Sequence, residues 1–537
     1  MAAVTPGKYF KSISWSWPGV SRWLLPGMLA GFVVAHCVLV SRTHLFWADE
    51  LLTWYPVSAR FGAMLSSTSD TINAAPPLYF ILTWFWAHVF GNSPLALRLL
   101  SALALGAAVL IMFYVLRRVY GVLAAILAVA VALAFCDPAL LAQATFARFH
   151  TLIVAEVALA ILLYQRMMAC QGRVPPTLFS ANVGIHACIV MTHYFGPLYS
   201  GAVLAGVLLT GAIRRFNPFR AVASIVLGWA VFLFWVPSFL RHRDMAKPSF
   251  WIAVPDAAAL RQYYGHYFTG DFWLMIAAGL GFFALAGIAL ALGGGCGSRK
   301  LFSRIFLIRH RELPLLMLVP GMGAIPLIAY FVSIRPGGAS FFLDRYMHSS
   351  ALGWAILCAH FAHRALATGA LNRHFRLRQI FAVAQAATIA AAICWGGCGL
   401  LRDGLSSSPK GEYEDPLVGS FYYDKIVVEH IHEYLGLNFY STWPQRYVFA
   451  VDEEVGIREG GGGAANHRIM AGLKRNFPES FAGVVPSDEF LAGAPSFWVK
   501  RNLATLWWPL RIEADPLFAS EPGAGQLVHV QRRATAQ

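Results

Sequence analysis

Two adjacent carboxylates, Asp49 and Glu50, are the residues of this sequence best suited to carry out chemistry. They follow the first long apolar run and lie between Trp47 and Trp54, so they are poorly placed to be a merely solvated pair. A partly buried carboxylate near other acids gains proton affinity and can accept a proton from a hydroxyl group. The alternative is structural, because Asp is a favoured cap at the start of a helix. Composition alone does not choose between the two interpretations.

Basic side chains lie at the ends of several other apolar runs, and aromatic side chains accompany them. The basic residues are Arg98, Arg148, His193 and Arg345. We expect these groups to converge with Asp49 on one face of a membrane, as a site at the bilayer surface requires.

The composition identifies the elements that must position these groups as membrane helices. The chain has 537 residues, of which 58% are hydrophobic and 13% charged, and this excludes an ordinary soluble globular protein. Residues 1–400 carry a net charge of +19 and residues 401–537 a net charge of −4. A basic excess orients membrane helices, so it does not indicate a nucleic-acid partner. The eight cysteines avoid the C-terminal region and suggest neither a disulfide framework nor a zinc site.

Eleven runs are long and apolar enough to cross a bilayer, which takes about 20 residues. They are 23–41, 99–116, 119–136, 149–165, 174–192, 194–213, 221–240, 272–298, 313–334, 346–363 and 379–401. A twelfth run, residues 77–91, is short and begins after Pro76. If it does not cross and the N-terminus is cytoplasmic, 19 Lys and Arg fall inside against 10 outside, whereas a crossing gives 11 against 18. We therefore predict eleven crossings, with residues 77–91 along or within the outer face.

This topology places eight of the ten acidic residues before position 401 on the outer side. Glu156 falls in mid-span, where we expect a hydrogen bond between helices, because an ionised group there is costly. Asp137-Pro138 is a pair that commonly stops a helix. The outer loop 241–271 mixes basic and aromatic residues and suits a segment at the membrane surface, either as a lid or as a ligand-binding element.

The C-terminal region changes in character. We predict a transmembrane domain over residues 1–401 and a soluble extracytoplasmic domain over 402–537. Helices are expected over 423–434 and 469–476, and strands over 446–451 and 497–500. The predicted fold class is therefore an all-α polytopic membrane protein, with outer-face juxtamembrane helices and a small C-terminal α/β domain. We expect that domain to cover the membrane site or meet the acceptor rather than to catalyse.

The order of several short motifs resembles that of a known superfamily. The motifs are Trp47-Ala48-Asp49-Glu50, Pro76-Pro77-Leu78-Tyr79-Phe80, Phe90-Gly91-Asn92-Ser93 with Arg98, Ala147-Arg148, Thr192-His193-Tyr194-Phe195-Gly196 and Asp344-Arg345-Tyr346. Each is weak alone, but together they are similar to the GT-C membrane glycosyltransferases. The nearest branch is the bacterial one related to protein mannosyltransferases and to lipid A aminoarabinose and lipopolysaccharide galacturonic acid transferases. The resemblance covers residues 20–400.

The resemblance implies a mechanism. Such enzymes transfer a sugar from a polyprenyl-phosphate carrier to a lipid, glycan or protein acceptor at the outer face of the inner membrane. By position, Asp49 is the general base, and Glu50 orients the acceptor or holds neighbouring basic groups. The residues implied in donor-phosphate binding are Arg148, Arg345, His193 and Arg98, although Arg98 could instead hold its own loop, and those implied in substrate binding are Tyr79, Tyr194 and Tyr346. No cofactor or metal site is implied, and a divalent metal requirement stays open.

The sequence departs from the superfamily at three positions. Many relatives carry His or Lys at the position of Ala75, Glu at that of Phe146 and Tyr at that of His150. The donor sugar therefore does not follow from the resemblance. The rival function is a secondary transporter or lipid flippase, which would need mid-span charges and an internal repeat. Glu156 is the only mid-span acid, and no repeat is evident.

Overall fold

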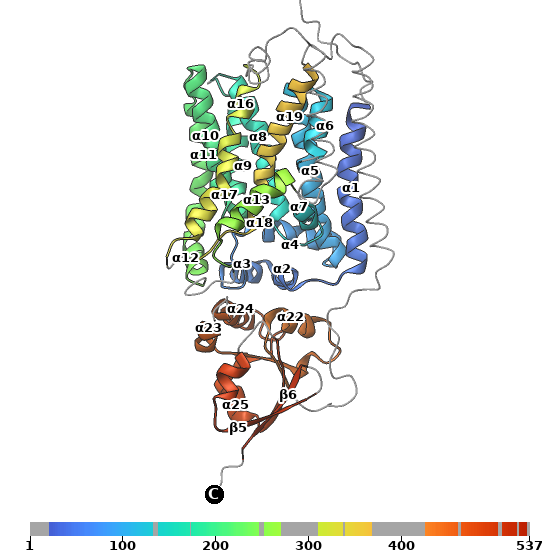
Figure 1. Cartoon of the computed structure of the whole chain (residues 1–537), viewed down its shortest axis with the longest axis vertical. Coiled ribbons are helices and arrows are strands. Elements are labelled where there is room, and N and C mark those ends of the chain that lie inside the picture. Colours follow the sequence, from blue (N-terminus) through green and yellow to red (C-terminus); the bar gives the residue numbers. More distant parts are fainter. Residues whose placement is uncertain are drawn as a thin grey trace, which may run out of the picture.

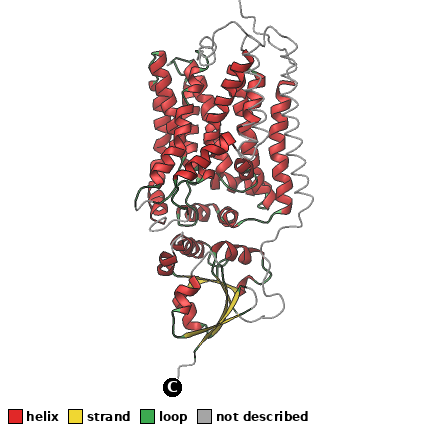
Figure 2. Ribbon diagram, viewed as in Figure 1, coloured by secondary structure: helices red, strands yellow, loops and turns green. Residues whose placement is uncertain are grey.

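The computed structural model describes residues 21–130, 132, 138–171, 173–245, 252–269, 310–336, 339–367, 425–459, 463–502, 507–523 and 526–533. The predicted spans 272–298 and 379–401, Asp137 and the predicted domain boundary at 401–402 lie outside these residues. Figure 1 shows a bundle of helices with a smaller domain at one end, and Figure 2 shows that the strands belong to that domain.

The bundle is built from long apolar helices. They are α1 (Ser21–Thr43), α5 (Pro94–Tyr120), α6 (Val122–Val129), α8 (His150–Ala169), α9 (Pro176–Thr192), α10 (Gly196–Arg214), α11 (Phe219–Ala230), α12 (Val236–Met245), α16 (Leu313–Leu316), α17 (Val319–Ser333) and α19 (Ala351–Ala367). Nine of the eleven predicted spans fall on these helices. Within the described residues, five helical stretches are long and apolar enough to cross a membrane, and three shorter apolar helices accompany them. The polytopic architecture is therefore confirmed, while the number of crossings stays a prediction.

Local sequence explains where helices begin and how closely they pack. Helix α5 starts with Pro94, and the Ser93 hydroxyl caps it by accepting the Ala96 N–H at 3.3 Å. Small residues let helices approach in membranes, where packing replaces the hydrophobic effect. At Gly228 of α11, an added Cβ would lie 2.8 Å from the carbonyl oxygen of Val183 in α9. Only glycine therefore allows this contact.

Short helices gather at the end of the bundle that faces the C-terminal domain. They are α2 (Ala48–Ser58), α3 (Phe61–Ser69), α4 (Leu78–Phe90), α7 (Pro138–Gln143), α13 (Ala257–Thr269) and α18 (Asp344–Met347). Figure 1 shows α2 and α3 lying across the bundle, between it and the C-terminal domain. Helix α4, the run expected to stay at the outer face, lies at the same end. We call this end of the bundle the α2 end.

The C-terminal domain, described from residue 425 to 533, is an α/β unit. Its sheet has the order β3-β2-β1-β4-β6-β5. The first four strands are parallel to one another, and β6 is antiparallel to both of its neighbours, β4 and β5. The strands are β1 (Ile426–Val428), β2 (Tyr447–Val451), β3 (Val484–Pro486), β4 (Ser496–Lys500), β5 (Phe518–Pro522) and β6 (Leu527–Arg532), and the helices are α22 (Ile431–Tyr440), α23 (Glu453–Glu459), α24 (Gly463–Asn476) and α25 (Ser487–Gly493).

Most local predictions for this domain are confirmed. Strands cover 447–451 and 496–500, and α24 contains the predicted helix 469–476. The predicted helix over 423–434 is wrong at residues 426–428, which form β1, and α22 begins at Ile431. Ile426, Val427 and Val428 are buried on both faces of the sheet, and such an apolar run cannot be told from a helix by periodicity alone.

The C-terminal domain docks on the α2 end through aromatic side chains. The Tyr55 ring of α2 lies 4.6 Å from that of Phe481 and 6.1 Å from that of Phe439. Two hydrogen bonds reinforce the contact: the Tyr440 hydroxyl accepts the Phe46 N–H at 2.7 Å, and Asn438 donates to the Tyr55 hydroxyl at 3.3 Å. The domain therefore packs directly on the helix that carries the paired carboxylates.

Candidate functional site

The site begins at the first turn of α2, where Asp49 and Glu50 occupy successive positions. Neighbours on an α-helix point about 100° apart, so the two carboxylates cannot face the same partners. Both carry negative charge at a helix N-terminus, where the helix dipole favours it. Their environments nevertheless differ: the Glu50 side chain is completely buried, whereas that of Asp49 is 16% exposed.

Glu50 holds the chain together around the site. Its two carboxylate oxygens accept the Nε and Nη2 protons of Arg98 at 2.8 and 2.7 Å. They also accept the N–H groups of Trp47 and Ala147 at 2.9 and 2.8 Å. Arg98 donates further to the carbonyl oxygens of His44 and Leu45. This buried ion pair therefore joins the start of α2, the start of α5 and the segment before α8.

This network bears on the roles considered for Glu50 and Arg98. Glu50 is the third helical residue after the N-cap Trp47, and its side chain reaches back to accept the Trp47 N–H. The structural role considered for Asp49 is thus carried out by its neighbour. Arg98 is 1% exposed and most of its N–H groups already have partners. Arg98 therefore holds its own loop, which is the alternative considered for it, and its expected role in donor-phosphate binding gains no support from the structure. Glu50 likewise holds a basic group, and its side chain is completely buried.

Asp49 faces the two other arginines. Its Oδ2 lies 3.2 Å from Nη1 of Arg345, which α18 supplies from nearly 300 residues along the chain. Arg148, from the segment before α8, donates through Nη1 to the Asp49 carbonyl oxygen at 2.9 Å and to Oδ1 of Asn73 at 3.1 Å. Asn73 in turn donates to the Leu52 carbonyl oxygen at 2.7 Å. The structure thus brings Asp49, Arg148 and Arg345 together, as we expected.

The arginines control the ionisation of Asp49. Burial by itself would raise the pKa of this carboxyl group. The guanidinium groups of Arg148 and Arg345 outweigh burial and hold the pKa of Asp49 below its usual range. Asp49 is therefore an ionised carboxylate at neutral pH, beside two cations that could bind an anion.

Aromatic and imidazole rings lie next to these charges. The His193 ring lies 4.9 Å from the rings of Phe149 and Tyr346, and the His150 ring lies 6.0 Å from that of Tyr346. The guanidinium of Arg345 lies over the Tyr346 ring, with its central carbon 5.9 Å from the ring centre. His193 is 4% exposed, and its Nδ1 accepts the Phe195 N–H at 3.1 Å. His193 and Tyr346 therefore belong to the Asp49 site.

The other two predicted tyrosines are placed differently. Tyr79 is fully buried and packs edge-on against Phe149, behind the site. The hydroxyl of Tyr194 lies 2.6 Å from Nδ1 of His242, and its ring packs against Phe239 of α12. Among the described contacts, none joins Tyr194 to the Asp49 site, so its expected role in substrate binding gains no support from the structure.

Three residues near Asp49 were not predicted from the sequence. Thr53 and Asn73 position Arg148, and His432 of α22 comes from the C-terminal domain. Asn73 could have been suspected, because it is a polar residue just before Ala74-Ala75-Pro76. Nothing in the sequence pointed to His432, since only the docking of the domain brings it near.

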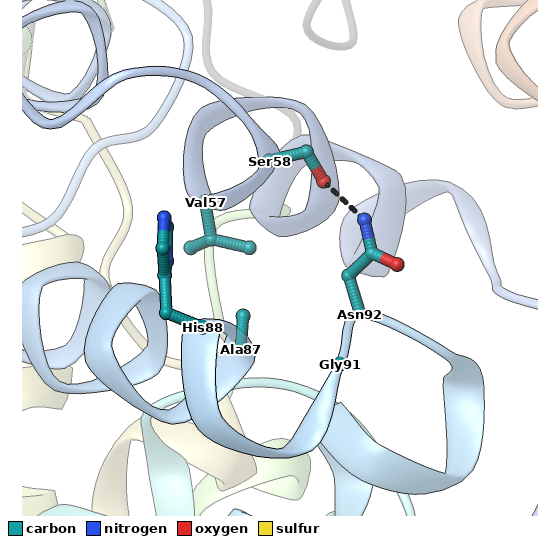
Figure 3. Close-up of a pocket in the computed structure, with 6 residues that line it drawn as sticks. All are labelled: Val57, Ser58, Ala87, His88, Gly91 and Asn92. Atoms are coloured by element: carbon teal, nitrogen blue, oxygen red, sulfur yellow. Dashed lines mark hydrogen bonds between the residues drawn. The ribbon is translucent and has the colours of Figure 1, made fainter.

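Two other features lie apart from the site. A hollow of about 270 Å³ opens between the end of α2 and the turn after α4, beside the hydrogen bond from Asn92 to Ser58 (Figure 3). It includes none of the charged residues described above. Glu156, in mid-helix, accepts the Thr192 hydroxyl proton at 2.8 Å and so links α8 to α9, as expected of a structural group. In the described part of the chain, no group of three His, Cys, Asp or Glu is placed to hold a metal ion.

Comparison with known proteins identifies the fold. No protein-family model matches the sequence, and no curated protein matches it. Among solved structures, the chain is similar to ArnT from Cupriavidus metallidurans bound to undecaprenyl phosphate, with a TM-score of 0.51, 14% identity, and 97% of this chain and 99% of ArnT covered. The apo state of the same protein gives a TM-score of 0.52 and 13% identity, with 95% and 98% covered. The likeness spans both chains almost completely and confirms the expected fold, including the C-terminal domain.

Proposed function

We propose that this chain is a glycosyltransferase that moves a sugar from a polyprenyl-phosphate carrier to an acceptor hydroxyl at the outer face of the inner membrane. The observation that carries the proposal is the ionised Asp49 carboxylate next to Arg148 and Arg345 at the α2 end. The fold supports it, because ArnT shares this fold and one of its crystal structures holds undecaprenyl phosphate. The α2 end then faces the periplasm.

The charges match the needs of such a transfer. Asp49 accepts the proton of the acceptor hydroxyl, and the resulting oxygen nucleophile attacks the sugar C1. The C1–O bond to the carrier breaks, and the phosphate retains the electron pair. A lipid monophosphate has its second ionisation near pH 6, so the leaving group needs positive charge more than a proton. Arg148 and Arg345 supply that charge from fixed positions, which is the arrangement that stabilises a transition state most.

The acceptor is a lipid, a glycan or a protein, and the donor is a polyprenyl-phosphate sugar. Tyr346 and His193 line the proposed donor side, because they pack next to Arg345 and Arg148. A transporter or flippase is the rival function. The mid-span Glu156 is engaged with Thr192, and Asp49, Arg148 and Arg345 lie together at the α2 end of the bundle. Both features favour chemistry at that end over passage through the bundle.

The first test measures binding of undecaprenyl phosphate to the full chain in lipid nanodiscs by native mass spectrometry. Arg345→Gln should weaken binding about tenfold or more, because a charge-assisted contact to phosphate is lost. Arg335→Gln is the matched control, since Arg335 is an exposed arginine just after α17. Equal binding by wild type and Arg345→Gln would count against the phosphate site.

The second test identifies the reaction. Mass spectrometry of envelope lipids and glycans from a deletion strain should show the loss of one sugar modification, which the wild-type gene restores. Proteoliposomes that carry labelled lipid across the membrane without any sugar transfer would favour the transporter instead.

A further inference from the structure

His432 of the C-terminal domain reaches the site on the membrane domain. It lies in the first turn of α22, and its ring meets that of Trp47 edge-on with the centres 5.4 Å apart. Trp47 lies two residues before Asp49 and contacts Phe146 on another side, at 6.0 Å. Both Trp47 and His432 are half-buried, so part of each side chain is exposed at the junction between the two domains.

The charges of the site act on His432. Burial lowers the pKa of this imidazole, Asp49 raises it and Arg345 lowers it, and the net result is a pKa below the usual value. His432 is therefore neutral at pH 7 and can both donate and accept a hydrogen bond. Within the described residues, neither of its ring nitrogens has a hydrogen-bond partner. A neutral, half-buried imidazole beside a catalytic carboxylate is thus available to a substrate.

The direction of approach indicates which substrate. Arg148 and Arg345 come from the helix bundle, so a donor with a polyprenyl tail reaches them from the bilayer. His432 comes from the opposite direction, because α22 lies on the far side of α2 from the bundle (Figure 1). An acceptor that arrives from outside the membrane meets the junction of α2 and α22 before it meets the arginines.

The geometry points to His432 as an acceptor-binding residue that completes the site from the C-terminal domain. This inference rests on the proposed glycosyl transfer and adds the acceptor side to it. The imidazole hydrogen-bonds a hydroxyl group of the acceptor while Asp49 takes the proton from the reacting hydroxyl. Trp47 provides an apolar ring surface next to both, as is common where sugar rings bind. The acceptor class that fits is therefore a polyhydroxylated glycan or glycolipid headgroup, and docking of the C-terminal domain is required for transfer.

A matched control lies two residues away. His430 is also half-buried, and its ring lies 4.9 Å from that of His432. The charges that act on its imidazole are those of His432, Glu433 and Lys500, all within the C-terminal domain. His430→Ala should therefore match the wild type in both binding and transfer, whereas His432→Ala should not.

The experiment compares wild type, His432→Ala, His432→Gln and His430→Ala in two assays. Undecaprenyl phosphate binding to the full chain should stay within twofold of wild type in all four. The envelope modification restored in the deletion strain should fall tenfold or more with His432→Ala and less with His432→Gln, which keeps a hydrogen-bonding amide. Modification at wild-type level by His432→Ala overturns the inference. So does a loss of undecaprenyl phosphate binding in that variant, since it would place His432 on the donor side.

A pH profile separates binding from a merely structural role. The charged groups that face His432 are Asp49 of α2 and Arg345 of α18, with His430 beside it. Asp49 stays ionised in the range used. Because the pKa of His432 is lowered, we expect transfer in membranes to decline only at a pH below the ordinary histidine pKa of about 6.5, as His432 takes up a proton. This decline should be absent in His432→Gln, and its persistence would count against the inference. If wild type binds no undecaprenyl phosphate and the deletion removes no sugar, the proposed function itself fails.

Discussion

Replacing Asp49 by Asn tests the central carboxylate without changing its size. The asparagine amide cannot accept a proton from the acceptor hydroxyl, so transfer should fall while the protein stays folded. The two arginines lose their negative neighbour at the same time. We therefore expect opposite effects on two measurements: slower sugar transfer and tighter binding of undecaprenyl phosphate.

The magnitudes follow from the geometry of the site. Loss of a general base typically slows a reaction by about 10²–10⁴-fold, or roughly 3–5 kcal/mol in activation free energy. For binding, two unit charges about 4 Å apart interact by about 4 kcal/mol at an effective dielectric constant of about 20. The Asp49 and Arg345 side chains are 16% and 20% exposed, and solvent screening reduces this value. We expect about 1 kcal/mol, which is about a fivefold gain in phosphate affinity.

The assay uses the full chain in nanodiscs for undecaprenyl phosphate binding and the deletion strain for transfer. Asp244→Asn is the control, because Asp244 is an exposed carboxylate at the same end of the bundle, paired with Arg243 at 3.0 Å. It should leave both measurements unchanged. Transfer by Asp49→Asn at the wild-type level would refute the role of Asp49 as base. Weaker phosphate binding by this variant would refute the idea that Asp49 and the phosphate compete for the same arginines.

Three further predictions concern stability and docking. Glu50→Gln should lower the free energy of unfolding by about 3–5 kcal/mol, because it leaves Arg98 charged and unpaired in the interior. Thermal unfolding in detergent measures this loss of stability, and the loss should be smaller in the double variant that also carries Arg98→Met. Asp70 accepts hydrogen bonds from Arg475 across the domain junction, and although burial opposes it, this contact holds the pKa of Asp70 below its usual value. Its contribution to docking is therefore complete above about pH 4 and lost as the pH falls through that lowered pKa. Arg475→Ala at pH 7 should accordingly speed hydrogen exchange in α24 about threefold, and an unchanged rate would exclude this contact as a support of docking. Gly472→Val should disturb the same junction, since even a Cβ there would lie 2.6 Å from the Thr71 hydroxyl, and limited proteolysis would detect the released domain.

The main features of the membrane domain were accessible from the sequence. Runs of about 20 apolar residues marked the helices, because lipid leaves the backbone no other partners than its own. Polar residues at the ends of those runs, such as Asp49, Arg148 and Arg345, stood out against an apolar background. Their common end of the bundle followed from the positive-inside count, and the structure brings them into contact.

The sequence did not show which of two similar residues is structural and which belongs to the site. Asp49 and Glu50 look equivalent in the sequence, and so do Arg98 and Arg148. Which carboxylate meets which arginine depends on the rotation of α2 about its axis, and packing sets that rotation. Glu50 turns inward to Arg98 and becomes structural, while Asp49 turns toward Arg345. Tyr194 lies between α9 and α10 and packs against Phe239 of α12, a contact that the sequence did not indicate.

The C-terminal domain shows most clearly which features sequence patterns can predict and which they cannot. Alternating and apolar patterns predicted two of its strands and one helix, since these patterns act over a few residues. The short strand at Ile426 was missed, because a run buried on both faces carries no periodicity. No pattern could associate His432 with Asp49, which lies more than 380 residues earlier. Hydropathy and charge, which act locally, were enough to identify a membrane bundle with a polar end. The pairing of side chains there required three-dimensional packing, because contacts between distant segments form only when whole helices and domains settle against each other.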